Sequence, residues 1–388
     1  MRKLGWNISR GWDVRRPKGL RRWRPGRTGG FPAQVLRGLG QVMLLASPWT
    51  GALGCLAVAL ADWRYAVYAT GGAALGTGTA RVLGVSRDRL DPGLEGFNSA
   101  LAALCCAVLL GPSRPSTALF AAAGCAVVTV LTAAAVRLLR GWDLPPLTLP
   151  YCVLAVAVSA AAPAFARLRP HDGGPTGPAA APGPAGPHLE EAARAFLHNV
   201  SQLFFLERWY VGALLLAAVL LADRTAGLAA CAGSATGVLT AWVLGAPAPL
   251  IADGTMGCNA VLVAMALYGV LLPAAPATLP YALLGAATAT VLTPAVAALL
   301  GPLGGRAFTW PFVLTTLCFL AAARSFPRLT GRGEAPAGPV PRRAPRGSSV
   351  PAGRRSTGHG SGAEAGTESV ACTVSTRSPA PGRTDRVP

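Results

Sequence analysis

Identical polar residues recur 161 positions apart in this sequence, and their chemistry is that of neutral hydrogen bonding. They include Gln41/Gln202, Asp62/Asp223, Thr79/Thr240, Asn98/Asn259, Thr129/Thr290, Thr132/Thr293 and Thr148/Thr309. Most are amides and hydroxyls, which can hold a polar molecule without carrying charge. The histidines, acids and cysteines form no group with catalytic or metal-ligand spacing. We therefore expect no catalytic residue, no metal and no cofactor.

Two short apolar segments, at about 34–46 and 196–207, contain Gln41 and Gln202. Such a segment cannot cross a bilayer, for which a helix needs about 20 residues, so we expect two re-entrant helices that end inside the membrane. An amide at such a place either lines a polar pathway or bonds to another buried group. The pathway is the favoured alternative, and the other remains open.

Thr148 and Thr309 begin two matched runs, Thr-Leu-Pro-Tyr and Thr-Trp-Pro-Phe. Each proline frees a backbone carbonyl about one turn earlier in the chain. The threonine hydroxyl can either satisfy that defect or face a pore, and the sequence does not choose between these alternatives.

A further matched run reads Gly-Leu-Glu-Gly-Phe-Asn at 93–98 and Gly-Thr-Met-Gly-Cys-Asn at 254–259. Paired glycines followed by asparagine are typical of a tight loop before a helix. We expect Asn98 and Asn259 to cap the helices that follow, in preference to contacting a solute. Phe97 is a candidate for the flat wall of a slot.

These residues belong to a unit that occurs twice, because residues 38–155 align without a gap on 199–316 with 40 identities in 118 positions. Each unit contains one short apolar segment and five longer ones. The expected spans lie near 48–62, 65–84, 96–112, 116–138 and 146–166, and near 209–222, 226–245, 256–273, 277–300 and 307–324. Five is an odd number, so the second unit must enter from the opposite face of the membrane.

The composition agrees with a membrane protein, since 52% of the 388 residues are hydrophobic. Ala, Leu, Val and Gly interleaved with Thr and Ser favour packed helices over barrel strands. The fold class we predict is an all-α integral membrane protein made of two inverted repeats of five transmembrane helices, each preceded by a short re-entrant helix.

The net charge of +19 lies mostly in the two tails. Residues 1–33 hold ten Lys or Arg against one acid, and residues 324–388 hold eleven Arg against four acids. The positive-inside tendency places both termini in the cytoplasm, next to membrane lipid of a plasma membrane. Binding of nucleic acid is not expected, because the tails lack the folded module and interleaved aromatic residues typical of it.

The chain divides into five parts. These are a basic N-terminal tail at 1–33, a first membrane repeat at 34–166, a Pro/Gly/Ala-rich linker at 167–190, a second membrane repeat at 191–324, and a disordered basic C-terminal tail at 325–388.

The sequence resembles the urea transporter family. The resemblance rests on Leu-Arg-Gly-Leu-Gly-Gln-Val-Met at 36–43, the Gly-Leu-x-Gly-Phe-Asn run at 93–98, and Trp-Pro-Phe-Val-Leu-Thr-Thr at 310–316, together with the duplication. It implies a homotrimer whose protomers each pass urea, or a similarly small neutral solute, through a pore between the two halves.

The resemblance also implies site residues. By position, two glutamines match polar sites of the short helices, two threonines match the central threonines, and apolar residues match the slot walls. Three positions depart from the family: Leu44 and Cys258 stand in place of Phe, and Glu95 is an unusual residue in the 93–98 run. The residues expected to line the pore are Gln41, Gln202, Thr148, Thr309, Phe97, Leu101, Leu262, Leu44, Phe205 and Cys258.

Passive transport is the function we predict, and an ion-coupled secondary transporter is the alternative. Coupling to protons or sodium usually requires an ionisable group inside the membrane. No expected span carries an acid near its centre; Glu95 and Asp253 stand at span entrances, where we expect solvated loop carboxylates. A membrane enzyme is disfavoured, since no convergent acid, base or metal groups occur in the spans.

Overall fold

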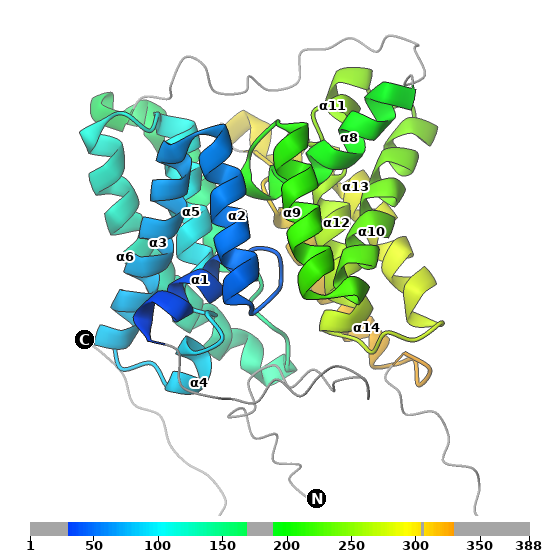
Figure 1. The fold of residues 1–388 in the computed structure, drawn as a ribbon, viewed down its shortest axis with the longest axis horizontal. Helices are drawn as coiled ribbons and strands as arrows, with labels where there is room; N and C mark the ends of the chain where they lie inside the picture. The colour runs from blue at the N-terminus through cyan, green and yellow to red at the C-terminus, as the bar shows by residue number, and fades with distance from the viewer. Residues whose placement is uncertain (1–29, 169–188, 304–305, 330–388) are drawn as a thin grey trace, which may run out of the picture. The chain divides into compact units, whose positions relative to one another are not determined.

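The computed structural model describes residues 30–168, 189–303 and 306–329. These residues form helices joined by short turns, with no strand among them (Figure 1). The predicted tails at 1–33 and 325–388 and the predicted linker lie mostly outside the described residues.

Among the described residues, the first half of the chain contains seven α-helices. They are α1 (Phe31–Gln41), α2 (Pro48–Ala61), α3 (Trp63–Val82), α4 (Arg87–Leu90), α5 (Phe97–Leu110), α6 (Pro115–Leu139) and α7 (Leu149–Ala161). Short 3-10 segments η1 (Arg140–Trp142), η2 (Ala162–Ala164) and η3 (Ala166–Leu168) follow α6 and α7.

The second half repeats this order. Its helices are α8 (Leu189–Ser201), α9 (Trp209–Ala222), α10 (Arg224–Val243), α11 (Ala248–Ala252), α12 (Cys258–Met265), α13 (Thr278–Leu300) and α14 (Trp310–Ala323). The 3-10 segments η4 (Gln202–Phe204) and η6 (Gly301–Leu303) follow α8 and α13, and the π-helical segment η5 (Ala266–Val270) extends α12.

The duplicated residues set the same helix boundaries in both halves. α9 and α10 begin and end 161 residues after α2 and α3. Between the two helices of each pair stands an aspartate whose carboxylate accepts the first free backbone N–H groups. Asp62 Oδ1 accepts from Arg64 N at 2.8 Å, and Asp223 Oδ1 accepts from Thr225 N at 2.8 Å. An acceptor at that position satisfies orphan donors of a helix start, which explains why a new helix begins directly after each aspartate.

Helix length distinguishes two classes of apolar helix. Within the described residues, three are long and apolar enough to cross a membrane by themselves: Pro115–Trp142, Arg224–Val243 and Thr278–Leu300. A pair bent by 76°, Glu190–Phe204 and Trp209–Ala222, makes a fourth if it counts as one span. Five shorter apolar helices, of 10–17 residues, lie within other expected spans: Pro48–Ala61, Phe97–Leu110, Leu149–Ala164, Cys258–Val270 and Trp310–Ala323.

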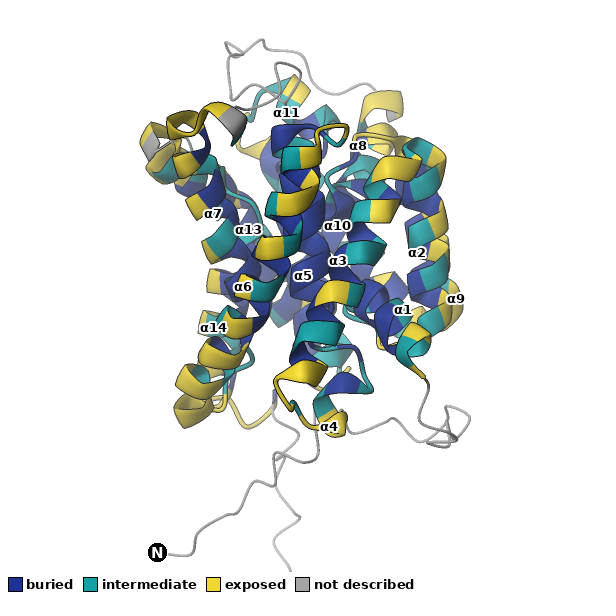
Figure 2. Cartoon of the chain, turned by 90° about the vertical axis from the view of Figure 1, so that its left-hand side faces the viewer, coloured by how far each residue is buried: buried dark blue, intermediate teal, exposed yellow. Residues whose placement is uncertain are grey.

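The central helices are enclosed by the others. In α5 nearly every residue is buried, and Figure 2 shows this helix in dark blue behind more exposed ones. α5 packs between α3 and α6, while α12 packs between α10 and α13. The halves meet where α2 packs on α9 and α7 on α14, and one apolar cluster there contains residues of both halves.

The short helices of the two halves lie at different ends. In Figures 1 and 2, α1 and α4 lie toward the lower end, whereas their counterparts α8 and α11 lie toward the upper end. α1 has 11 residues and α8 has 13, as expected for helices too short to span a bilayer.

Candidate functional site

Thr148 and Thr309 precede α7 and α14, and their hydroxyls meet between the two halves. The two Oγ1 atoms are 2.8 Å apart, and Thr309 Oγ1 also lies 3.1 Å from Cys152 Sγ. Neither hydroxyl bonds to its own helix end. The partners of these hydroxyls among the described residues lie across the boundary between the halves, which favours the pore-facing alternative over the repair of a helix defect.

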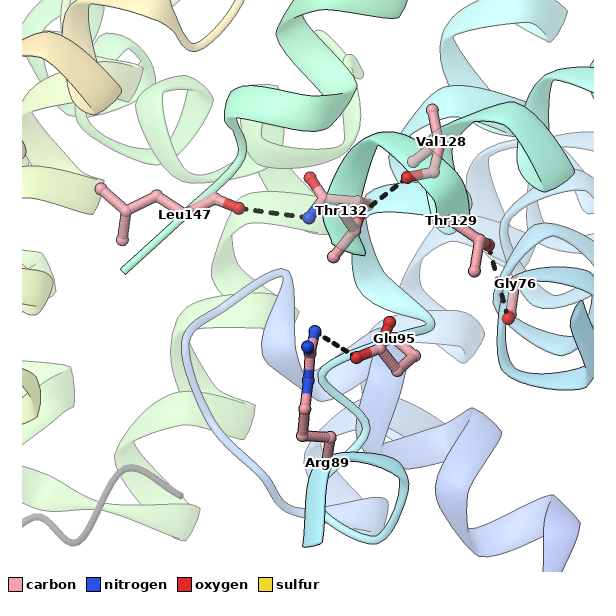
Figure 3. Close-up of polar contacts among 8 residues, drawn as sticks. Gly76, Arg89, Glu95, Val128, Thr129, Thr132 and Leu147 are labelled. Carbon is pink, nitrogen blue, oxygen red and sulfur yellow. Dashed lines mark hydrogen bonds and ion pairs between the residues drawn. The ribbon is translucent and has the colours of Figure 1, made fainter. Parts of the chain in front are cut away.

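The residue before each threonine has a left-handed backbone although it is not glycine. Leu147 has φ 49° and Phe308 has φ 44°. Such a conformation costs on the order of 1 kcal/mol or more and persists only where the surroundings hold it. The hold is visible here, because Asn98 Nδ2 donates to Leu147 O at 3.1 Å and Asn259 Nδ2 donates to Phe308 O at 3.2 Å (Figure 3 shows the Leu147 carbonyl).

The expectation that Asn98 and Asn259 cap their own helices is thus wrong. The cap positions of α5 and α12 are Gly96 and Gly257, and neither helix has a side-chain cap bond. Both asparagines are buried, and a buried amide must find partners wherever a polar group is within reach. The carbonyls before α7 and α14 are the partners, so the asparagines position the segments that carry the threonines.

The expected wall residues gather in the apolar cluster that joins the halves. Phe97, Leu101 and Leu262 are buried members of this cluster. Leu44 and Phe205 pack against it, half-buried and at equivalent positions, with φ 58° and 59°. Because Leu44 and Phe205 share a left-handed backbone, the chain turns in the same way after each of the two short helices.

Cys258 lies apart from this contact, half-buried at the start of α12. Its Sγ donates to Thr255 O at 3.5 Å. The sulfur also accepts from Asn259 Nδ2 at 3.7 Å, so both of its partners are close to it in the chain.

Gln41 and Gln202 have equivalent partners in the two halves. Gln41 Nε2 donates to Pro92 O at 3.1 Å, and Gln202 Nε2 donates to Asp253 O at 2.9 Å. The partners are backbone carbonyls rather than buried amides. Because the NH₂ group of each side chain is used in this way, its Oε1 faces away from the bond as an acceptor for another donor.

The two acids at the span entrances differ. Glu95 is 1% exposed and ion-paired with Arg89, so the expectation of a solvated carboxylate is wrong for it (Figure 3). A partnered cation within the fold is what allows a carboxylate to be buried. Asp253 is half-buried, and its Oδ1 accepts from Thr255 N at 2.8 Å and from Thr255 Oγ1 at 2.7 Å.

Comparison with known proteins decides what this neutral, hydroxyl-centred site belongs to. The family model described as "Urea transporter" matches residues 33–324. The chain belongs to the urea transporter family. It is similar to Urea transporter 1 of Ovis aries, with 26% identity over 305 residues, 77% of this chain and 79% of the relative. It is equally similar to Urea transporter 1 of Capra hircus, with 26% identity over 307 residues and the same coverage.

As a family member, the protein is a multi-pass membrane protein that transports urea and is not an enzyme. The match confirms the resemblance drawn from the three motifs and the duplication. It also covers both halves, so the threonine pair lies within the matched region.

Tyr151, Cys152 and Phe308 lie near the threonines and were not predicted. The ring of Tyr151 lies 6.0 Å from the rings of both Phe205 and Phe308, and Cys152 contacts Thr309. Tyr151 and Cys152 follow Thr148 within one helical turn, so their proximity could have been inferred from the spacing. The meeting of Tyr151 with Phe205, from the other half, could not.

A cleft of about 510 Å³ lies away from this site, between α3, α5 and α6. Trp63, Arg64 and Ser113 line one part of it, and Leu75 and Ala121 another. None of the expected pore residues borders this cleft.

Proposed function

We propose that this urea transporter works as a passive channel with its pore along the boundary between the two halves. The observation that carries the proposal is the contact of Thr148 Oγ1 with Thr309 Oγ1 at 2.8 Å. When a residue touches its own counterpart, both lie beside the axis that relates the halves. In duplicated transporters, solute sites occur at such a seam near the middle of the membrane.

The topology of the proposal is two inverted repeats of five spans, each preceded by a re-entrant helix. The one-to-one match of helices and the opposite ends occupied by α1 and α8 support it. Shorter helices such as α5 reach their span length together with the turns that flank them, which are tolerated where protein buries them. Arg81, Arg87 and Arg137 lie on one side in this topology, which supports a cytoplasmic location of both termini in the plasma membrane.

Neutral acceptors and apolar walls suit urea. Urea is planar, and its N–H groups all lie in its plane, so a row of oxygens can replace its water shell while flat walls cover its faces. In the proposal, Thr148, Thr309 and the Oε1 atoms of Gln41 and Gln202 supply the oxygens. Leu44, Phe205, Phe97, Leu101, Leu262 and Cys258 supply the walls. Ions are rejected because such walls cannot repay the loss of their hydration.

The absence of coupling in this proposal rests on the helices that carry or directly follow the proposed pore residues. The sequences of α5, α7, α12 and α14, all within the described residues, contain no charged residue. Ion-coupled carriers usually place an ionisable group there. A homotrimer with one pore in each protomer is part of the proposal and is supported by the family membership alone.

Stopped-flow light scattering on proteoliposomes tests the channel. Vesicles that contain the protein should equilibrate a urea gradient faster than empty vesicles, and the rate should not change when a proton or sodium gradient is imposed. Uptake that follows either ion gradient would favour the coupled transporter instead. Equal rates in protein-containing and empty vesicles would refute the proposal.

A further inference from the structure

The loop that joins α4 to α5 anchors the short helix α1. Three side chains from one face of α1 reach this loop. Gln34 Nε2 donates to Asp91 Oδ1 at 2.7 Å, Arg37 Nη1 donates to Asp91 O at 2.8 Å, and Gln41 Nε2 donates to Pro92 O at 3.1 Å. Their spacing of three and four residues puts them on one helical face. The position of the loop therefore sets the position of Gln41.

The loop and α1 also touch backbone to backbone. Gly93 has φ +82°, and a Cβ added to it would collide with Gly38 N. A Cβ added to Gly38 would lie 3.3 Å from Gly96 Cα. No side chain lies between the two backbones at these glycines, so a shift of the loop would also shift α1. Phe97 begins α5 immediately after the loop, so its position also depends on the loop.

One buried ion pair closes this loop. Glu95 is 1% exposed, and its partner Arg89 on α4 has a side chain that is 26% exposed (Figure 3). Burial raises the pKa of the Glu95 carboxyl, and the Arg89 charge lowers it by a smaller amount. Glu95 Oε2 has no hydrogen-bond partner among the described residues.

The other charged groups on the surrounding elements are engaged elsewhere. Arg37 on α1 donates to the Asp91 carbonyl, Asp91 accepts from Gln34, and Arg81 on α3 donates to Gln34 Oε1 at 2.8 Å. The nearest α3 residues, Gly76 and Thr77, are uncharged. Arg89 is therefore the cation on which the buried carboxylate depends.

The second half shows which parts of this arrangement are required by the fold. The bonds to the backbone are kept, since His198 Nδ1 lies 2.6 Å from Ala252 O and Gln202 donates to Asp253 O. The ion pair is not kept. The counterparts of Arg89 and Glu95 are Leu250 and Met256, which pack in an apolar cluster. An apolar pair thus closes the same loop, and the fold does not need charge there.

We propose that Arg89 and Glu95 are positioning residues for urea transport, which hold the 91–96 loop, and with it Gln41 and Phe97, in the conducting arrangement only while Glu95 is ionised. A proton on Glu95 removes the partner of Arg89, whose guanidinium then turns toward the water that it already partly contacts. Urea flux falls on acidification as a result. The inference rests on the proposed pore.

The first experiment measures urea flux in wild-type proteoliposomes from about pH 8 to about pH 4, a range that includes the ordinary pKa of glutamate and extends well above it, because burial raises the pKa of Glu95. Urea itself does not titrate in this range, and empty vesicles at each pH give the background. We expect flux to fall on the order of tenfold, because residues that act on a site without touching its ligand can change it by about that factor. A flat profile in vesicles that pass urea at neutral pH overturns the inference and leaves the channel standing.

Matched variants separate the charge from the fold. Glu95→Gln should show the low, acid-like flux at every pH. The double variant Arg89→Leu/Glu95→Met copies the second half and should keep neutral-pH flux without pH dependence. Arg89→Lys, which keeps a cation, should retain the pH dependence, as should Asp88→Asn, which removes an exposed acid on the same helix. Wild-type flux in Glu95→Gln at all pH values overturns the inference.

Hydrogen exchange gives a readout that does not depend on urea. At neutral pH, backbone amides of 91–98 should exchange faster in Glu95→Gln than in the wild type, while those of 252–259 serve as the internal reference. Equal exchange in the first segment overturns the inference even if no urea flux is observed. Absence of flux in the wild type at neutral pH overturns the proposed channel instead.

Discussion

Replacing Thr148 and Thr309 by valine, singly and together, separates what the hydroxyl pair does for the fold from what it does for urea. Valine keeps the shape and removes the oxygen. In a single variant the remaining, at least half-buried hydroxyl loses its partner at 2.8 Å, which costs up to about 1 to 3 kcal/mol of stability. Thr309→Val should be the more destabilising of the two, because Thr309 also contacts Cys152 at 3.1 Å.

The double variant should recover stability, because replacing both partners of a hydrogen bond by apolar groups is nearly neutral. Urea flux should change in the opposite order. Each hydroxyl lost from the pathway removes one acceptor, worth about 0.5 to 1.5 kcal/mol, so each single variant slows urea roughly twofold to tenfold. The double variant loses both acceptors and should be the slowest.

The assay compares thermal unfolding in detergent with stopped-flow urea flux for the four proteins of the cycle. Stability should show a coupling energy of about 0.5 to 3 kcal/mol between the two sites, as for residues in direct contact. A folded double variant that passes urea like the wild type would remove the hydroxyls from the pathway. A double variant as unstable as the sum of the singles would contradict the hydroxyl contact itself.

Two further predictions compare equivalent positions. Asn259→Ala should lower stability by about 1 kcal/mol more than Asn98→Ala, because Asn259 Oδ1 also accepts from Phe312 N at 3.2 Å. Thermal unfolding measures the difference, and equal losses would contradict this prediction. Gln41→Leu and Gln202→Leu should each slow urea roughly twofold to tenfold through the loss of an acceptor, while the protein stays folded. Stopped-flow flux measures the first effect and thermal unfolding the second. Undiminished flux in both variants would place the glutamines outside the pore.

The helices and their order were predictable because the signals that set them lie close together in the sequence and occur in both repeats. The aspartates at 62 and 223 stop one helix and start the next, and the apolar lengths separate short helices from long ones. A repeat at constant offset also predicts that equivalent residues adopt equivalent geometry, as the bonds of Gln41 and Gln202 confirm.

The errors concern contacts and backbone conformations that exist only in the folded chain. Asn98 looked like a helix cap because the sequence shows only its neighbours, whereas its partner is Leu147, 49 residues later. Glu95 looked solvated because acids at helix entrances usually are, and its burial follows from the position of Arg89 in the folded loop. The left-handed backbone at Leu147 and Phe308 carries no signal such as glycine, so nothing in the residue type announced it.

The two halves differ in a way that follows from the axis between them. A residue that touches its own counterpart must be compatible with itself, and a hydroxyl satisfies this condition because it both donates and accepts, whereas two carboxylates or two ammonium groups repel each other. Thr148 and Thr309 must therefore be a residue type that can pair with a copy of itself. Arg89 touches Glu95 within its own half and never meets Leu250, so each half can close that loop by its own chemistry. On this reasoning a difference between the halves in pH response belongs to the loops at their outer ends, and a neutral, self-pairing group belongs at the centre.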